Sequence, residues 1–89
     1  MRKAKLTIIN KLGLHARAAS KFVSCASRFA SSVNVTKDGQ RVNGKSIMSV
    51  MMLAAGQGSI LELELDGPDE GEALAALEAL VADYFGEGE

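Results

Sequence analysis

The chain has 89 residues, of which 47% are hydrophobic and 24% are charged. This balance is typical of one small globular domain, here residues 1–89, rather than of a disordered or fibrous protein. One Cys and one His allow no internal disulfide and are too few for a usual zinc site, so we expect no metal and no cofactor. No apolar run approaches the roughly 18 residues of a membrane span, and the amino end lacks a signal-peptide pattern, so we expect a cytoplasmic protein without membrane contact.

The net charge of −1 conceals two halves of opposite sign. Every Lys and Arg lies between Arg2 and Lys45, and Asp38 is the only acidic residue before Glu62. A basic half could contact nucleic acid, but the aromatic residues that would stack on bases all fall in segments with a helical pattern. We therefore expect a protein or phosphate partner and no nucleic acid.

The chain begins with the pattern of a strand, a turn and a helix. Alternating apolar and polar residues predict a half-buried strand over Ala4–Ile8, and Asn10–Gly13 interrupts it as a turn. Ala16–Phe29 carries apolar side chains at helical spacing and predicts a helix that starts directly after His15. Cys25 falls within this helix, where a buried, unreactive thiol is the expected role.

A hairpin and a second helix follow. Val33–Lys37 and Gln40–Asn43 are short strand patterns joined by Asp38-Gly39, a pair that favours a tight type I′ turn. Ser46 then precedes the apolar run Ile47–Ala54, which predicts a helix with Ser46 as its N-cap.

The last third contains one strand and one helix. Gly56 is expected to close the second helix in a left-handed conformation, and the alternation over Ile60–Asp66 predicts a strand with one wet face. Gly67–Glu70 opens the final helix. Its predicted apolar stripe consists of Leu74, Leu77, Leu80, Val81 and Tyr84.

The resulting order, β-α-β-β-α-β-α, predicts an α+β fold. It contains the split β-α-β-β-α-β unit, in which helices cover one face of an antiparallel sheet. This architecture supports many unrelated activities, so function has to be argued from a site.

The segment from Asn10 to Arg17 predicts a phosphate site. A flexible turn brings His15 to the start of a helix, where the backbone N–H groups of Ala16, Arg17 and Ala18 favour nearby negative charge. The Arg17 guanidinium can neutralise phosphoryl oxygens. The positive helix end disfavours a protonated imidazole, which leaves a ring nitrogen of His15 able to attack phosphorus. An ordinary cap or surface His is the alternative. Since the P-loop and the glycine fingerprint are absent, the phosphate has to come from another molecule.

Asn-Lys-Leu-Gly-Leu-His-Ala-Arg at positions 10–17 closely resembles the active-site motif of the HPr family, the histidine-containing phosphocarriers of bacterial phosphotransferase systems. Lys45-Ser46-Ile47-Met48 resembles the second motif of that family. The resemblance covers nearly the whole chain and implies an open-faced sandwich of four antiparallel strands with three helices on one face. It further implies that His15 accepts the phosphoryl group on Nδ1 and that Arg17 assists as a cation.

By the same resemblance, the protein is a monomeric, stoichiometric carrier that forms a phosphohistidine and is not an enzyme. Enzyme I, phosphorylated from phosphoenolpyruvate, is the implied donor, and an enzyme IIA-type protein is the implied acceptor. The family commonly has Pro after the motif Arg, where this chain has Ala18. Together with the sequence of the second helix, this difference resembles the nitrogen-related (NPr) branch. A sugar-transport HPr is the alternative.

The second helix has more apolar side chains than one buried stripe needs. We expect Val50 and Leu53 in the core. The resemblance implies that Ile47, Met48 and Met51 form an exposed docking patch beside His15, and flexible Met side chains suit successive partners. The cations expected around this patch are Lys11, Arg17, Lys21 and Lys45.

Ser46 is expected first of all to cap the second helix. By resemblance it is also the residue that an HPr kinase/phosphorylase modifies in some bacteria, so regulation at Ser46 is a second hypothesis.

Two other classes of function stay open. One is a small ligand-sensing or RNA-binding regulatory module, although the strands carry no base-stacking aromatics. The other is a hydrolase built on Cys25 and His15, for which no third orienting group is evident.

Overall fold

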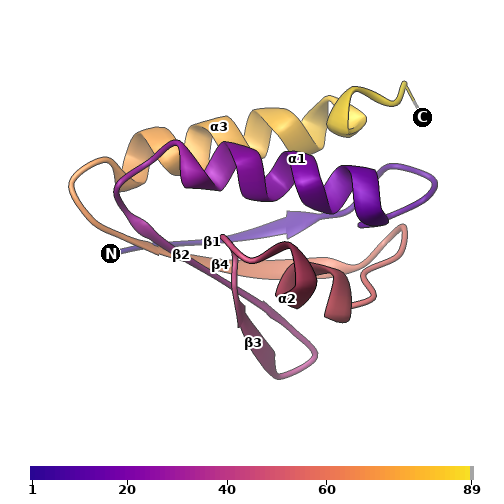
Figure 1. Cartoon of the computed structure of the whole chain (residues 1–89), viewed down its shortest axis with the longest axis horizontal. Helices are drawn as coiled ribbons and strands as arrows, with labels where there is room; N and C mark the ends of the chain where they lie inside the picture. Colours follow the sequence, from indigo (N-terminus) through magenta and orange to yellow (C-terminus); the bar gives the residue numbers. More distant parts are fainter. Residues whose placement is uncertain (89) are drawn as a thin grey trace.

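The computed structural model describes residues 1–88. Its elements are β1 (Arg2–Thr7), α1 (Ala16–Ser27), β2 (Ser32–Lys37), β3 (Gln40–Asn43), α2 (Ile47–Met52), β4 (Ile60–Asp66), α3 (Glu70–Ala82) and a short 3-10 turn, η1 (Tyr84–Gly86). The four strands form one antiparallel sheet in the order β1-β4-β2-β3. The three α-helices lie on one face of this sheet (Figure 1). The predicted open-faced α+β arrangement is therefore confirmed.

The alternation of side chains along the strands decides which face of the sheet is covered. Leu61, Leu63 and Leu65 of β4 are fully buried beneath the helices. The residues between them point to the open face, where the register sets Glu62 opposite Lys5 of β1. Because neighbouring side chains of a strand point to opposite faces, the same short segment supplies both the core and a charged outer surface.

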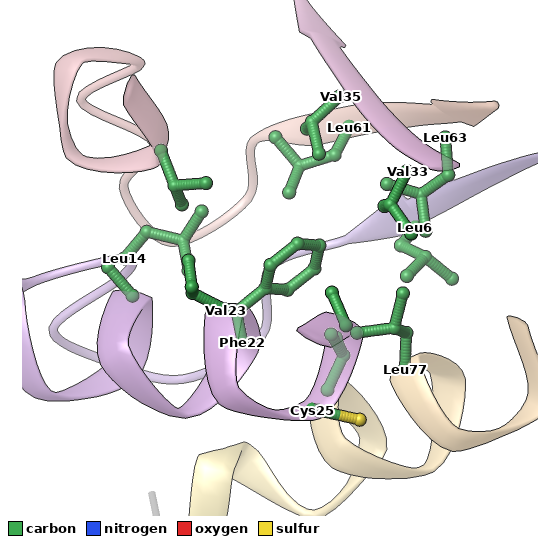
Figure 2. Packing of buried hydrophobic residues seen from close by; sticks show 14 of the residues in the cluster. Leu6, Leu14, Phe22, Val23, Cys25, Val33, Val35, Leu61, Leu63 and Leu77 are labelled. Atoms are coloured by element: carbon green, nitrogen blue, oxygen red, sulfur yellow. The ribbon is translucent and has the colours of Figure 1, made fainter. Parts of the chain in front are cut away.

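Helix α1 is fixed to the sheet by its buried face. Phe22 is fully buried, and its ring points from α1 toward Leu61 and Val35 of the sheet (Figure 2). Leu77 of α3 joins the same cluster. Burying a side chain of this size contributes about 1.5–3 kcal/mol, so this contact is a main anchor of the helix.

Two local predictions are confirmed by the backbone. Asp38 and Gly39 both have positive φ, 50° and 82°, which matches the type I′ turn expected between β2 and β3. Ser46 is the N-cap of α2, and its side chain accepts a hydrogen bond from the backbone N–H of Ser49.

Both α1 and α2 end earlier than predicted. Helix α1 ends at Ser27 rather than Phe29, and α2 ends at Met52 rather than Ala54. The left-handed residue after α2 is Ala54, with φ of 50°, and not Gly56. The next carbonyl, that of Ala55, accepts a bond from the N–H of Leu14, so a tertiary contact determines where the chain leaves α2.

The carboxyl end also differs from its prediction. The apolar stripe was expected to include Tyr84, but α3 ends at Ala82 and Tyr84 is part of η1 and exposed. Tyr84 and Phe85 have φ of 55° and 52°, a left-handed backbone that cannot continue an α-helix. The reversal instead inserts Phe85, which is fully buried, into the core.

Asp69 ties the beginning of α3 to the connection between α1 and β2. Its carboxylate accepts hydrogen bonds from the backbone N–H groups of Ala30 and Ser31, both at 2.9 Å, and from the Ser31 hydroxyl at 2.5 Å. The Ser31 hydroxyl, followed by the Ala30 amide, lowers the pKa of the Asp69 carboxyl below its usual value. The ionised carboxylate is therefore favoured in the folded state.

This tie predicts an acid-sensitive contribution to stability. Since the pKa of Asp69 is lower in the folded than in the unfolded chain, its contribution is present above the ordinary value of about 3.9 and is lost as the pH falls through the folded value. Asp69→Asn should be less stable than wild type at neutral pH and should lose less stability on acidification. Thermal melts followed by circular dichroism over about pH 6 to 2.5 measure this. Glu78→Gln, on the exposed side of α3, is the control, and equal acid slopes in wild type and Asp69→Asn would contradict the assignment.

Candidate functional site

The turn before α1 packs tightly against the segment that follows α2. Gly13 has φ of 68°, and a Cβ at this position would lie 2.7 Å from Cα of Gly56 and in hard contact with the Ala55 carbonyl. The N–H of Leu14 donates to that same carbonyl at 2.8 Å. Only glycine fits such a left-handed position with this approach of two backbones. The position of His15, two residues later, follows from this contact.

His15 is the N-cap of α1, with an extended backbone and no capping bond from its side chain. The first backbone bond of the helix runs from the N–H of Ala19 to the carbonyl of His15. The N–H groups of Ala16, Arg17 and Ala18 therefore have no acceptor within α1, as at any helix start. They form a local positive region next to the imidazole.

Arg17 lies beside His15 in an open hollow of about 620 Å³. The lining residues are Leu12, His15, Ala16, Arg17, Gly86 and Glu87. Within residues 1–88, the Arg17 guanidinium takes part in no hydrogen bond or ion pair. The same residues contain no cluster of His, Cys, Asp and Glu that could hold a metal ion and no helix long and apolar enough to cross a membrane.

A carboxylate that the sequence did not predict completes the site. Oε2 of Glu87 contacts Nε2 of His15, and Oε1 of Glu87 accepts a hydrogen bond from Nδ2 of Asn10 at 2.9 Å. Asn10 is fully buried, and Nδ2 also donates to the Gly13 carbonyl at 2.8 Å. The Asn10 amide first, and the His15 ring next, lower the pKa of the Glu87 carboxyl, so Glu87 is ionised at neutral pH.

The fold of the carboxyl end brings Glu87 to His15. The buried Phe85 anchors the end of the chain, and Nζ of Lys21 donates to the Phe85 carbonyl at 2.7 Å. Figure 1 shows the carboxyl end at the same side of the molecule as the start of α1. Since 72 residues separate His15 from Glu87, no local pattern in the sequence could have revealed the pair.

The burial of the α2 side chains agrees with the sequence prediction. Val50 and Leu53 are buried, whereas Ile47, Met48 and Met51 are exposed, Met48 by 73%. In α2 and in the turn before His15, two further apolar side chains are exposed that were not predicted. These are Met52 and Leu12, 67% and 68% exposed.

Two of the cations predicted around this patch are held by backbone carbonyls. Lys45 donates from Nζ to the Phe29 carbonyl at 2.8 Å, and Lys21 is bound to Phe85. Lys11 is exposed, as is Arg17. Cys25 is a free, buried thiol that belongs to the core cluster, so its expected burial is confirmed.

Comparison with known proteins identifies the family. Residues 2–83 match the family model described as PTS HPr component phosphorylation site. The chain is 62% identical over 89 residues to the phosphocarrier protein HPr of Neisseria meningitidis serogroup A, with all of both chains covered, and 61% identical over 83 residues to that of Cupriavidus necator, with 93% of each covered. The crystal structure of HPr-C-His from Thermoanaerobacter tengcongensis matches with a TM-score of 0.94 at 47% identity, covering 98% of each chain. The chain belongs to the HPr family of phosphotransferase-system phosphocarriers, and it is a carrier rather than an enzyme.

Proposed function

We propose that this carrier accepts a phosphoryl group on Nδ1 of His15 from enzyme I and passes it to an enzyme IIA-type protein. The observation that carries the proposal is the state of the imidazole, which is 31% exposed at the start of α1. One ring nitrogen, Nε2, is occupied by Glu87. Within residues 1–88, Nδ1 has no hydrogen-bond partner and is the nitrogen left for reaction.

The surroundings of His15 suit a group that alternates between a neutral ring and a phosphorylated ring. In the transfer, the lone pair of Nδ1 forms the new bond to phosphorus while the bond between phosphorus and the donor breaks. The N–H groups of Ala16, Arg17 and Ala18 and the Arg17 guanidinium stabilise the negative charge on the phosphoryl oxygens. The helix N–H groups are held by the backbone before the phosphate arrives, so they need little reorganisation.

The exposed face of α2 is the proposed docking surface for both partners. Ile47, Met48 and Met51 expose apolar side chains next to the segment that holds the His15 turn. Apolar side chains with several flexible bonds adapt to more than one partner surface. The exposed cations Lys11 and Arg17 favour acidic partners through electrostatic steering.

The acceptor proposed here belongs to the nitrogen-related branch. Ala18, in place of the Pro that is common in the family, and the sequence Gly44–Met48 support this choice. Ala18 is fully buried, so the difference lies in the packed first turn of α1. Phosphorylated protein offered separately to a sugar-transport and a nitrogen-related enzyme IIA distinguishes the branches by which acceptor takes the phosphate faster.

Phosphorylation by enzyme I and phosphoenolpyruvate tests the carrier function. Intact-mass spectrometry should show one acid-labile phosphoryl group on wild type and none on His15→Ala, whose thermal melting should stay close to that of wild type because the side chain is outside the core. Phosphorylated His15→Ala would disprove the assignment of the acceptor.

Arg17→Glu should slow the transfer by on the order of a hundredfold without abolishing it, since the cation stabilises charge and is not the nucleophile.

Met48→Asp tests the docking surface. A charge placed in an apolar interface is costly only when the partner binds, so the affinity for enzyme I should fall about tenfold or more while the melting temperature changes little. Ile60→Asp is the matched control, because Ile60 is 56% exposed at the start of β4, outside α2. Titration calorimetry measures the affinity, and equal losses in both variants would rule out a specific role for the α2 face.

Ser46 is proposed as a regulatory phosphorylation site in addition to its role as the N-cap of α2. Its Oγ accepts from the N–H of Ser49 at 3.4 Å, directly before the exposed Ile47 and Met48. A phosphate would add about −1.5 to −2 charges beside this surface and oppose docking of an acidic partner.

Comparison of two substitutions separates the roles of Ser46. Ser46→Asp can still cap α2, so it should keep its stability and accept phosphate from enzyme I slowly, whereas Ser46→Ala should lose about 1 kcal/mol and accept it at the normal rate. Thermal melts and initial rates of phosphorylation measure both effects. If Ser46→Asp were phosphorylated on His15 as fast as wild type, only the structural role would remain.

A further inference from the structure

The two carboxylate oxygens of Glu87 face two different groups, the amide of Asn10 and the ring of His15. Nδ2 of Asn10 uses one hydrogen on the Gly13 carbonyl and the other on Oε1 of Glu87. This fixes Oε1, so the second oxygen, Oε2, faces Nε2 of His15. A carboxylate oxygen only accepts hydrogen bonds, and therefore Nε2 has to carry the proton. A neutral imidazole with a proton on Nε2 has its lone pair on Nδ1.

The surroundings hold Glu87 in this place. Asn10 is fully buried, and the Glu87 side chain is only 13% exposed although it lies close to the carboxyl end of the chain. The preceding residues Tyr84, Phe85 and Gly86 have φ of 55°, 52° and 77°. Left-handed backbone is unfavourable for the two aromatic residues, so the burial of Phe85 has to stabilise it. A carboxyl-terminal segment that made no contacts after α3 would have no reason to adopt this left-handed backbone.

Glu87 is not the only charged group near the imidazole. Arg17 lines the same hollow, and Lys21 stands behind the carboxyl-terminal turn with Nζ on the Phe85 carbonyl. The amino end of α1 adds the partial positive charge of its free N–H groups beside the ring. Of these groups, the Glu87 carboxylate is the one in contact with a ring nitrogen, Nε2, so it selects the tautomer.

We propose that Glu87 is a positioning residue that, through its contact with Nε2, orients the His15 ring and keeps Nδ1 free as the nucleophile. This role rests on the proposed transfer through His15. While Nδ1 attacks phosphorus and the donor keeps the electron pair of the broken bond, the proton stays on Nε2. The product ring carries phosphorus on Nδ1 and hydrogen on Nε2 and is formally cationic, and the Glu87 carboxylate stabilises it.

The same proton also prepares the onward transfer. When the acceptor attacks phosphorus, the bond between phosphorus and Nδ1 breaks and its electron pair returns to Nδ1. With Nε2 protonated, the leaving group is a neutral imidazole rather than an anion. No proton has to be gained or lost at His15 in either direction, which suits a carrier that is loaded and unloaded repeatedly.

Glu87→Gln is the informative variant because Gln offers one acceptor oxygen for two donors. Either Asn10 or His15 then loses its partner, and the Gln amide can donate to an unprotonated Nε2 instead. Glu87→Asp retains two acceptors on a side chain shorter by one methylene. Glu78→Gln removes the same charge from an exposed position of α3 and is the matched control.

The test combines ring-nitrogen spectroscopy with transfer rates on the full chain labelled with 15N at His. At about pH 8, above the range in which a free imidazole titrates, wild type and Glu78→Gln should show a protonated, hydrogen-bonded Nε2 and an unprotonated Nδ1. Glu87→Gln should lose the hydrogen-bonded Nε2 proton signal and gain the tautomer with the proton on Nδ1, and its phosphorylation by enzyme I should slow about tenfold. Glu87→Asp should lie between Glu87→Gln and wild type in both measurements.

A wild-type ring with its proton on Nδ1, or an Nε2 signal unchanged in Glu87→Gln, would overturn the proposal even if the transfer rate fell. Thermal melts show whether Glu87→Gln has lost the carboxyl-terminal turn. In that case Glu87→Asp decides, and an Asp variant that resembles Glu87→Gln in its ring tautomer would likewise refute the role. The spectroscopic measurement needs no phosphoryl donor, so failure of wild type to be phosphorylated on His15 would disprove the carrier proposal separately.

Discussion

The packing of α1 on the sheet is the constraint on which the site depends. Phe22 fills the space between the helix and the strands, and the fully buried Ala18, Ala19 and Ala26 allow the helix backbone to approach closely. This packing leaves the amino end of α1 where the turn at Gly13, the segment after α2 and the carboxyl-terminal turn meet. His15 contributes nothing to the core itself, yet its position is set by side chains that do.

Charged groups of both signs lie around the imidazole of His15. A carboxylate close to a phosphoryl acceptor would oppose the incoming anion if both approached the same atom. Here Glu87 faces Nε2, and the phosphoryl group is proposed to approach Nδ1. The carboxylate and the proposed phosphate thus belong to different nitrogens of the ring.

The outer surfaces of the molecule differ in a way that matters for recognition. On the open face of the sheet, Arg41 forms an ion pair with Glu64 at 3.2 Å, and Lys5 stands opposite Glu62. Charges that are already paired and hydrated gain little from a partner. The exposed Met side chains of α2 are apolar and carry no charge to be paired. Burying their area is favourable wherever a partner offers a matching surface.

The sequence alone determined the features whose causes are local. Strand alternation, the Asp38-Gly39 turn, the Ser46 cap and a helix beginning directly after His15 all depend on residues within a few positions of one another. The tertiary structure decided the early ends of α1 and α2, the burial of Phe85 in place of Tyr84, and the carbonyl partners of Lys21 and Lys45. It also decided the contact of Glu87 with His15 across 72 residues. Local periodicity carries no information about which distant backbone groups and side chains will compete for the same space, and the contact that orients His15 is of this long-range kind.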